Sequence, residues 1–197
     1  ISAFDGAHAP VMMKVDLNDI GCDLYTGSMH KWLFATKGTG FLYLRDKSVM
    51  DRVWNTIATG GYDDPTRMAD RYMQIGSSCI PTLMGLNAAI SFADSIGMER
   101  IEARNRMLAD YIHAEMVKRG AEDWTSPDPA LRCAIATVNV PPVQRMELQD
   151  WLWKNHKVRI RGGNPSKLRL ATPYFLSKAD IDRFLGLFDE YRKMKGA

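Results

Sequence analysis

The chain has 197 residues, of which 46% are apolar, and this is enough for one full domain or for two small domains with real cores. Its formal net charge of +3 and sequence pI near 8.8 are mild, and Lys and Arg are spread along the chain, so nothing indicates a nucleic-acid partner or a lipid surface. The sequence shows no apolar run long enough to cross a bilayer and no signal peptide.

The cysteines are Cys22, Cys79 and Cys133. They are odd in number and widely spaced, and they lack the close pairs that metal sites use. This usage predicts a protein of the reducing cytoplasm without a metal centre.

The first predicted strand ends at Asp5, and residues 6–10 then form a turn that cannot continue regular structure. A short helix is expected next, with Asp16 or Asn18 as its N-cap. Burying the Asp5 carboxylate at a strand end is costly unless it meets a cation or several donors. We therefore expect Asp5 to have such a partner.

The second predicted strand, 23–25, leads through a turn of small residues to Lys31. A glycine turn at 37–40 and an apolar strand at 41–44 follow. A lone lysine in such a place normally points to water, because lysine is almost never fully buried without a partner. The two strand ends and the glycine turn around Lys31 favour a chemical role instead.

A lysine that forms a Schiff base, together with a carboxylate that pairs with a protonated pyridine nitrogen, is the minimal equipment for pyridoxal phosphate chemistry. The segments that carry this equipment are Asp5-Gly-Ala-His8, then Ser28-x-His30-Lys31-Trp32, then Lys37-Gly-Thr-Gly. In this order and spacing they resemble the class V aminotransferase family of fold-type I enzymes. The resemblance implies an α/β fold, namely the C-terminal part of a fold-type I pyridoxal-phosphate-dependent transferase.

The resemblance also implies a role for each matching residue. Lys31 would form the internal aldimine and then move the substrate's α proton, while Asp5 would keep the pyridine nitrogen protonated. His8 would hydrogen-bond the cofactor's phenolic oxygen, and Ser28 and His30 would contact its phosphate. Two alternatives stay open: His8 caps its own turn, or His30 is a packed core histidine.

Members of this family are about twice as long as this chain, which begins inside a strand just before Asp5. We expect a C-terminal fragment of a longer protein rather than one partner of a separate N-terminal chain. The expected division is a remainder of the large cofactor-binding domain at residues 1–97 and a small C-terminal domain at residues 98–197.

Helical periodicity predicts a helix over residues 45–54, and glycines and a proline at 60–65 then predict a loop that runs to Met73. The next stretch, Gly76-Ser77, resembles the family's Gly-Thr, which reaches the cofactor phosphate of a neighbouring subunit. Ser77 is thus a candidate phosphate contact in a homodimer. The alternative is that Ser77 and Ser78 only cap the helix that begins near Pro81.

Cys79 lies in the same stretch, and no base can be assigned to it from the sequence. We therefore interpret Cys79 as a buried structural thiol rather than a nucleophile.

The remaining elements follow from periodicity and turn residues. Helices are predicted at 82–96 and 99–119, separated by Gly97, and then a strand at 133–140, a helix at 143–155, strands at 158–161 and 168–172 and a helix at 178–194. The last helix is marked by a capping box at Ser177 and Asp180. Its apolar stripe is predicted to be core: Ile181, Phe184, Leu185, Phe188 and Tyr191.

Arg169 places a guanidinium on an otherwise apolar strand, where its donor geometry matches a carboxylate. The family's substrate-carboxylate arginine sits in this pattern, so the resemblance implies that Arg169 binds the amino acid. The alternative is a structural salt bridge to Asp180 or Asp182.

Cysteine desulfurases of the family carry a catalytic cysteine just before this strand, whereas residues 161–167 contain none. Trp32 and the short loop look more like the isopenicillin N epimerase branch, which also includes aminotransferase-like and carbon-sulfur lyase members. The resemblance therefore implies an epimerase or aminotransferase acting at the α carbon of an amino acid, and disfavours a desulfurase. The alternatives are a carbon-sulfur lyase and an inactive dimerising module, while a generic hydrolase lacks a Gly-x-Ser-x-Gly elbow.

Overall fold

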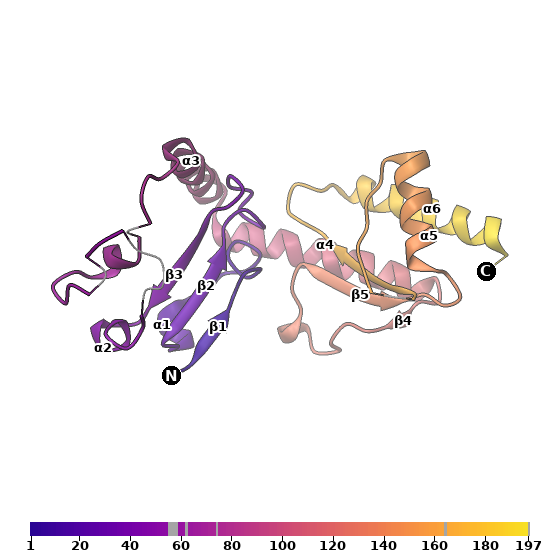
Figure 1. The fold of residues 1–197 in the computed structure, drawn as a ribbon. Coiled ribbons are helices and arrows are strands. Elements are labelled where there is room, and N and C mark those ends of the chain that lie inside the picture. The colour runs from indigo at the N-terminus through magenta and orange to yellow at the C-terminus, as the bar shows by residue number, and fades with distance from the viewer. Residues whose placement is uncertain (55–58, 62, 74, 164, 197) are drawn as a thin grey trace. The chain divides into compact units, whose positions relative to one another are not determined.

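Two three-stranded sheets organise the chain, one in each of two units, Ile1–Met98 and Glu99–Ala197. The computed structural model describes residues 1–54, 59–61, 63–73, 75–163 and 165–196 (Figure 1). Expected as the C-terminal part of a fold-type I enzyme, the chain does form a mixed α/β fold. The assignment of residues 1–97 and 98–197 to a large and a small domain stays a prediction.

The first sheet brings the ends of two parallel strands together. β1 (Ala3–Asp5) pairs in parallel with β2 (Leu24–Ser28), and Asp5 lies opposite Thr26. β3 (Gly40–Leu44) pairs antiparallel with β2, so Gly40 lies opposite Ser28. Because parallel strands run in one direction, the segments after Asp5 and after Ser28 leave the same edge of the sheet.

Helix α1 (Leu17–Ile20) begins where the carboxylate of Asp16 accepts hydrogen bonds from the backbone N–H groups of Asn18 and Asp19. Asp16, rather than Asn18, is therefore the N-cap. Helix α3 (Ile80–Ile96) begins two residues earlier than predicted, and Gly97 ends it with a positive φ of 93°.

The helix predicted over 45–54 is shorter than expected. α2 (Lys47–Met50) begins after Asp46, whose carboxylate accepts from Val49 N. After Met50 the chain makes a tighter turn, in which the Met50 carbonyl accepts from Val53 N at 3.2 Å and also from the Tyr72 hydroxyl at 2.6 Å. The loop predicted to reach Met73 also contains a short 3₁₀ helix, η1 (Ala69–Met73).

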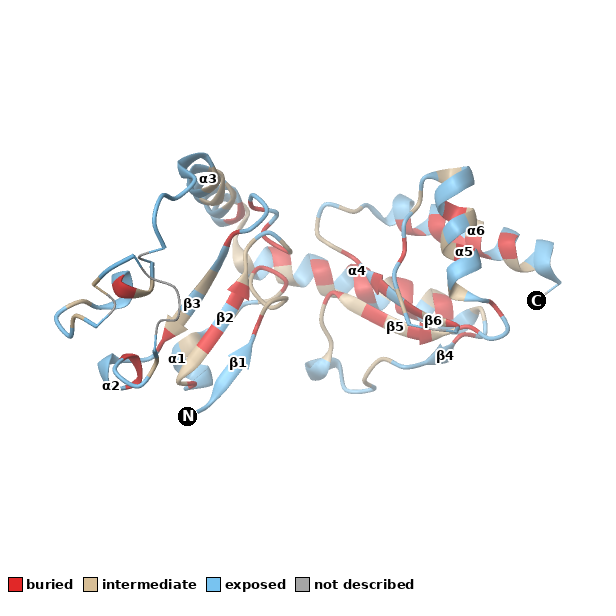
Figure 2. Ribbon diagram, viewed as in Figure 1, coloured by how far each residue is buried: buried red, intermediate tan, exposed pale blue. Residues whose placement is uncertain are grey.

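In the second unit, β4 (Glu122–Asp123), β5 (Ile135–Asn139) and β6 (Lys167–Ala171) form an antiparallel sheet. The helices are α4 (Met98–Lys118), η2 (Pro129–Leu131), α5 (Arg145–Trp151), the π-helix η3 (Leu152–His156) and α6 (Lys178–Lys195). Apolar side chains of α4, α5, α6, β5 and β6 make one core (Figure 2). The capping box of Ser177 and Asp180 and the buried stripe on α6 are confirmed.

The strand predicted at 158–161 is wrong. Val158 N donates to the carbonyl of Leu152, the first residue of η3, which takes that donor away from the sheet. Only Arg161 forms a bridge with Arg169, where Arg169 N donates to Arg161 O at 2.7 Å. β4, which has two residues, was not predicted.

Candidate active site

Asp5 ends β1 at the edge of the sheet from which the Lys31 segment also leaves. The next residue, Gly6, continues the pairing, since its N–H donates to the Thr26 carbonyl at 2.9 Å. The Asp5 carboxylate accepts from Ala7 N at 3.0 Å and is exposed. The carboxylate thus has a backbone donor. We expected Asp5 to be buried, and this expectation is wrong.

Gly6 and Tyr25 make a close approach that only glycine permits. A Cβ at position 6 would lie 2.0 Å from the Tyr25 ring. Tyr25 is buried, and this burial raises the pKa of its hydroxyl. The turn that carries His8 is therefore pressed against the second strand of the sheet.

His8 is connected to the Lys31 segment by a hydrogen bond from Trp32, the residue that follows Lys31. Trp32 Nε1 donates to His8 Nδ1 at 3.1 Å, and the Trp32 ring is buried. The turn itself is closed by backbone groups, with Ala9 N donating to Gly6 O. His8 Nδ1 therefore accepts from Trp32 and does not cap its own turn.

Lys31 lies in a bent segment that follows β2 and is fixed by backbone hydrogen bonds. Lys31 N donates to Ser28 O at 3.4 Å, and Ala35 N donates to Met29 O at 3.2 Å. Phe34 takes a positive φ of 57°, which is uncommon for a residue with a bulky side chain. Lys31 is half-buried.

His30 is exposed, so it is not a packed core histidine. Its Nδ1 lies 3.0 Å from the Thr39 carbonyl. A carbonyl can only accept, so Nδ1 carries the proton in this contact, and Nε2 of the neutral ring has none. Met29 N also donates to Thr39 O, which joins the lysine segment to the turn before β3.

Asp5, His8 and Lys31 line one cavity of about 350 Å³. Its other walls come from neighbouring residues of the same edge: Phe4, Gly6, Ala7, Ala9, Met12 and Tyr25. A carboxylate, an imidazole and an amine thus share one concave site with apolar walls. Ser28 and His30 are close to Lys31 in sequence but are not among the lining residues.

Ser77 is exposed in the stretch between η1 and α3. The residue at the N-cap of α3 is Cys79, and no side-chain capping bond is present there, so the alternative role of Ser77 and Ser78 as caps is not seen. Cys79 is exposed, so its interpretation as a buried thiol is wrong. The Thr82 side chain, by hydrogen bonding, lowers the pKa of the Cys79 thiol.

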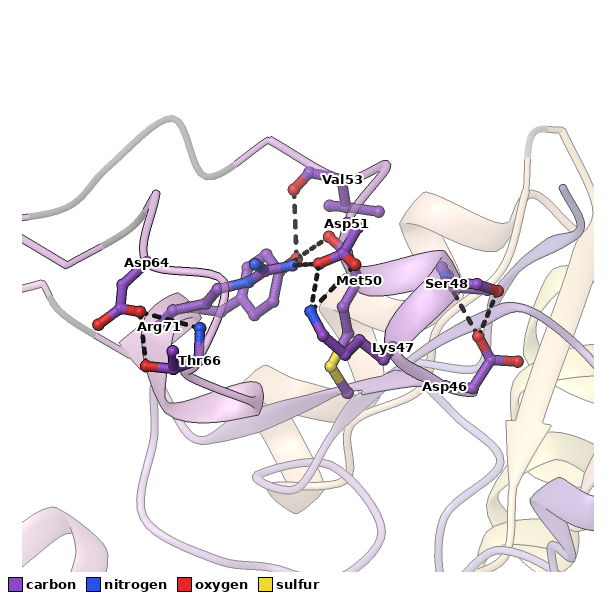
Figure 3. Close-up of polar contacts among 11 residues, drawn as sticks. Asp46, Lys47, Ser48, Met50, Asp51, Val53, Asp64, Thr66 and Arg71 are labelled. Atoms are coloured by element: carbon purple, nitrogen blue, oxygen red, sulfur yellow. Dashed lines mark hydrogen bonds and ion pairs between the residues drawn. The ribbon is translucent and has the colours of Figure 1, made fainter.

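A polar cluster holds η1 against the end of α2 (Figure 3). Arg71 is buried, and its Nη2 contacts Asp51 Oδ1 at 3.3 Å and the Tyr72 hydroxyl at 3.1 Å. The Tyr72 hydroxyl donates to the Met50 carbonyl at 2.6 Å. Lys47 binds the same carboxylate of Asp51 at 3.0 Å. These contacts hold Arg71 in place, six residues before Ser77.

Arg169 lies in the second unit on β6, opposite Thr137 of β5. Its neighbours Leu168 and Leu170 are buried, whereas Arg169 is exposed on the other face of the strand. The Asp180 carboxylate accepts from Ser177, and the Asp182 carboxylate accepts from the Tyr111 hydroxyl. Both carboxylates of the alternative salt bridge are therefore engaged by other groups.

The sequence did not predict how two residues support the cavity, Tyr25 as part of its wall and Trp32 as the donor to His8. An aromatic next to the lysine was noticed, but its contact depends on a turn 24 residues away. Among the described residues, the structure contains no cluster of three or more potential metal ligands. Nor does any helix in those ranges have the length and apolarity needed to cross a membrane.

The chain is similar to known proteins in sequence and in fold. The family model described as Aminotransferase class-V matches residues 1–177. An isopenicillin N epimerase of Streptomyces clavuligerus is 28% identical over 94% of this chain and 51% of its own length. A probable cysteine desulfurase of Halalkalibacterium halodurans is 30% identical over 73% of this chain and 36% of its own length.

A cysteine desulfurase from Thermococcus onnurineus NA1, solved in its apo form, has the same fold. It superposes with a TM-score of 0.84 at 20% identity, over 97% of this chain and 52% of that chain. The chain thus spans about half the length of the curated relatives it matches. With the family model covering most of its residues, the chain belongs to the aminotransferase class-V family.

Proposed function

We propose that the chain contains the part of an active site that includes Lys31, in a pyridoxal-phosphate-dependent enzyme that acts at the α carbon of an amino acid. The observation that carries this proposal is the shared cavity of Asp5, His8 and Lys31. The donor set fits the cofactor, because a carboxylate, an imidazole and an amine are the groups needed for its pyridine nitrogen, phenolic oxygen and aldehyde. Family membership supports the same cofactor.

When bound, pyridoxal phosphate supplies an aldehyde for covalent attachment and a conjugated ring that draws electrons from the α carbon. Asp5 would hold a proton at the ring nitrogen by its negative charge. His8 accepts from Trp32 at Nδ1, so in its neutral form its proton is at Nε2, where it can donate to the phenolic oxygen. The Lys31 amine, once free, would accept the α proton as a general base.

His30 and Ser28 are proposed to contact the phosphate. If His30 keeps its hydrogen bond to Thr39 through Nδ1, it can donate to a phosphate oxygen through Nε2 only as an imidazolium. A doubly negative phosphate favours this charged form. The hydroxyl of Ser28 would add a neutral donor.

Arg169 is proposed to bind the α-carboxylate of the amino acid by its planar pair of donors. A proton delivered by another group to the opposite face of the α carbon would give epimerisation, whereas a proton returned to the carbon of the cofactor would give transamination, so the groups opposite Lys31 decide between the two. We favour these two reactions because residues 161–167 lack a cysteine for desulfuration. The similarity to an isopenicillin N epimerase supports the same choice, and carbon-sulfur lysis is the remaining enzymatic alternative.

The second candidate function is an inactive dimerising module. Helix α3 favours it, since among its described residues only Ala93 is buried, while Ile80, Met84 and Phe92 are exposed (Figure 2). We propose for the enzyme itself a homodimer in which Ser77 contacts the phosphate of the partner's cofactor. The free thiols Cys22, Cys79 and Cys133 fit a cytoplasmic protein.

A visible spectrum of the full-length protein with pyridoxal phosphate, before and after borohydride, tests this proposal. Peptide mapping of the reduced protein should find the cofactor attached to Lys31. Amino acids would then be screened by chirality and by keto-acid formation to separate the reactions. A protein that takes up no cofactor, or that is labelled at another lysine, would overturn the enzyme proposal in favour of the module. A cofactor-loaded monomer in gel filtration would contradict the shared phosphate site.

A further inference from the structure

A second cavity, of about 410 Å³, lies within the second unit. Its walls come from α4, from the segment after η3, from β6 and from the start of α6. Its lining combines apolar residues with the charged side chains of Arg159, Arg161, Arg169, Asp180 and Arg183. No role proposed above uses this cavity, except that Arg169 is shared.

The cavity is bordered by the hydrophobic core of the unit. Ile112, Ile160, Leu170, Ile181 and Phe184 are all buried, and each belongs both to the core and to the lining. The arginines of its lining are exposed, so the cavity is open to solvent on one side and bounded by the core on the other. Its volume falls in the range of small-molecule sites, roughly 300–1,000 Å³.

The charged residues of the lining are four arginines and one aspartate. Asp180 is already engaged, because its carboxylate accepts from Ser177 N at 2.8 Å and from Ser177 Oγ at 2.7 Å. Arg169 belongs to the proposed amino-acid site. Arg159, Arg161 and Arg183 therefore decide which ligand the cavity favours.

Neutral groups orient two of these three arginines. Arg183 Nη2 donates to the His156 carbonyl at 2.8 Å, and the Arg159 guanidinium lies 4.7 Å from the centre of the Trp153 ring. A carbonyl and an indole position a guanidinium without cancelling its charge. In the part of the chain that the structure describes, Arg159 and Arg161 form no ion pair, and Arg183 interacts electrostatically with Asp180 without a close ion pair. The lining thus keeps an excess of positive charge beside an apolar wall.

We propose that this cavity binds an organic carboxylate with an apolar body, with the carboxylate at Arg161 and Arg183 and the body against the core residues. A guanidinium binds a planar carboxylate through two parallel hydrogen bonds. An inorganic anion would leave the apolar wall unfilled, and an amine would be repelled by the arginines. The inference does not depend on the proposed function, because neither residue takes part in cofactor binding.

Calorimetric titration of the full-length protein with sodium octanoate tests the proposal. Octanoate is expected to bind saturably at one site per chain, whereas octylamine, which lacks the anion, and acetate, which lacks the apolar body, are expected to bind at least tenfold more weakly. Saturable octylamine binding of equal affinity, or no octanoate binding, would overturn the inference. This result would leave cofactor binding at Lys31 untouched, so the two proposals fail separately.

Two variants locate the site. Arg161→Gln removes one guanidinium and should weaken octanoate binding by about tenfold to a hundredfold. Leu176→Trp enlarges a half-buried lining side chain and should reduce binding by occupying volume without changing charge. Lys193→Gln, which removes a charge from α6 outside the lining, is the matched control and should bind as the wild type does. Binding that is unchanged in both Arg161→Gln and Leu176→Trp would exclude this cavity.

The carboxylate can be a separate ligand or the side chain of the amino-acid substrate. Titration of the cofactor-loaded protein with 2-aminooctanedioate, whose apolar side chain ends in a carboxylate, followed by the visible spectrum, separates these sources. If octanoate competes with the spectral change and Leu176→Trp weakens both, the cavity receives the substrate's side chain. If octanoate binds without affecting the spectral titration, the cavity holds a separate ligand.

Discussion

Trp32 Nε1 donates a hydrogen bond to His8 Nδ1 at 3.1 Å and so joins the residue after Lys31 to the turn after Asp5. The indole nitrogen can only donate, so it selects the form of neutral His8 that has its proton at Nε2. One contact thereby fixes both the orientation of the imidazole and the direction in which it can donate. The buried Trp32 ring in turn limits the movement of the Lys31 segment.

Replacing Trp32 with Phe should weaken pyridoxal phosphate binding about threefold to tenfold, since one neutral hydrogen bond that orients His8 is lost. The dissociation constant can be measured by cofactor absorbance in the full-length protein. If Trp32 acts through His8, the effects of Trp32→Phe and His8→Gln should not add in the double variant. Additive effects would mean that Trp32 contributes only to packing. Trp124→Phe, an exposed tryptophan of the second unit, is the control.

Lys31→Ala should abolish exchange of the substrate's α proton, because the proposed general base is lost. We expect at least about a hundredfold to ten-thousandfold loss, the usual contribution of such a group. Exchange in deuterated water, followed by NMR over a panel of amino acids, detects this step for an epimerase, an aminotransferase or a lyase alike. Lys37→Ala, at an exposed residue outside the cavity, should exchange at the wild-type rate. Exchange retained by Lys31→Ala would assign the proton transfer to another residue.

The sequence was informative wherever one local rule decided the structure. The stripe on α6, its capping box and the Asp16 cap depend on neighbouring residues, and each is confirmed. The motif order around Asp5 and Lys31 identified the family because its spacing is local too.

Distant contacts explain what was not predicted. The end of α2 is held by a hydroxyl 22 residues away, on Tyr72, which donates to the Met50 carbonyl. Likewise, residues 158–161 do not form a strand because Val158 N donates to the Leu152 carbonyl of η3. The Trp32 and His8 contact also joins two turns whose sequences carry no sign of each other. Helical periodicity and strand propensity describe one segment at a time, so they cannot detect such contacts.

Tyr72→Phe should lower the free energy of unfolding of the first unit by about 1–3 kcal/mol, because buried polar partners lose their bonds. The hydroxyl donates to Met50 O and accepts from Arg71 Nη2, and Arg71 is buried. Urea unfolding measures the change, with Tyr43→Phe as a control of the same chemistry. The chain before Ser77 should also be cut faster by protease. Equal stability of the two variants would show that the cluster does not hold η1.

Arg169→Gln should raise the concentration of amino acid needed for half saturation by about tenfold to a hundredfold, since a charged pair of hydrogen bonds to the carboxylate is lost. The half-saturating concentration of Arg169→Lys should lie between those of the wild type and Arg169→Gln, because lysine keeps the charge but lacks the planar pair of donors. Lys167→Gln on the same strand controls for charge alone. Substrate titrations of the cofactor-loaded protein measure all three, and a wild-type response of Arg169→Gln would exclude it as the carboxylate site.

Ser177→Ala should destabilise α6 by about 1 kcal/mol near neutral pH, the usual cost of losing an N-cap. The Ser177 hydroxyl and backbone N–H also hold the pKa of the Asp180 carboxyl below its ordinary value of 3.8. A folded-state pKa that is depressed stabilises the protein above the unfolded pKa, and this stabilisation is lost as the pH falls through the folded value. The difference between wild type and Ser177→Ala in urea unfolding should therefore shrink as the pH falls below about 4. Ser91→Ala, at an exposed serine within α3, should show no such dependence, and a difference that stays constant with pH would mean that the Asp180 carboxylate adds nothing to the cap.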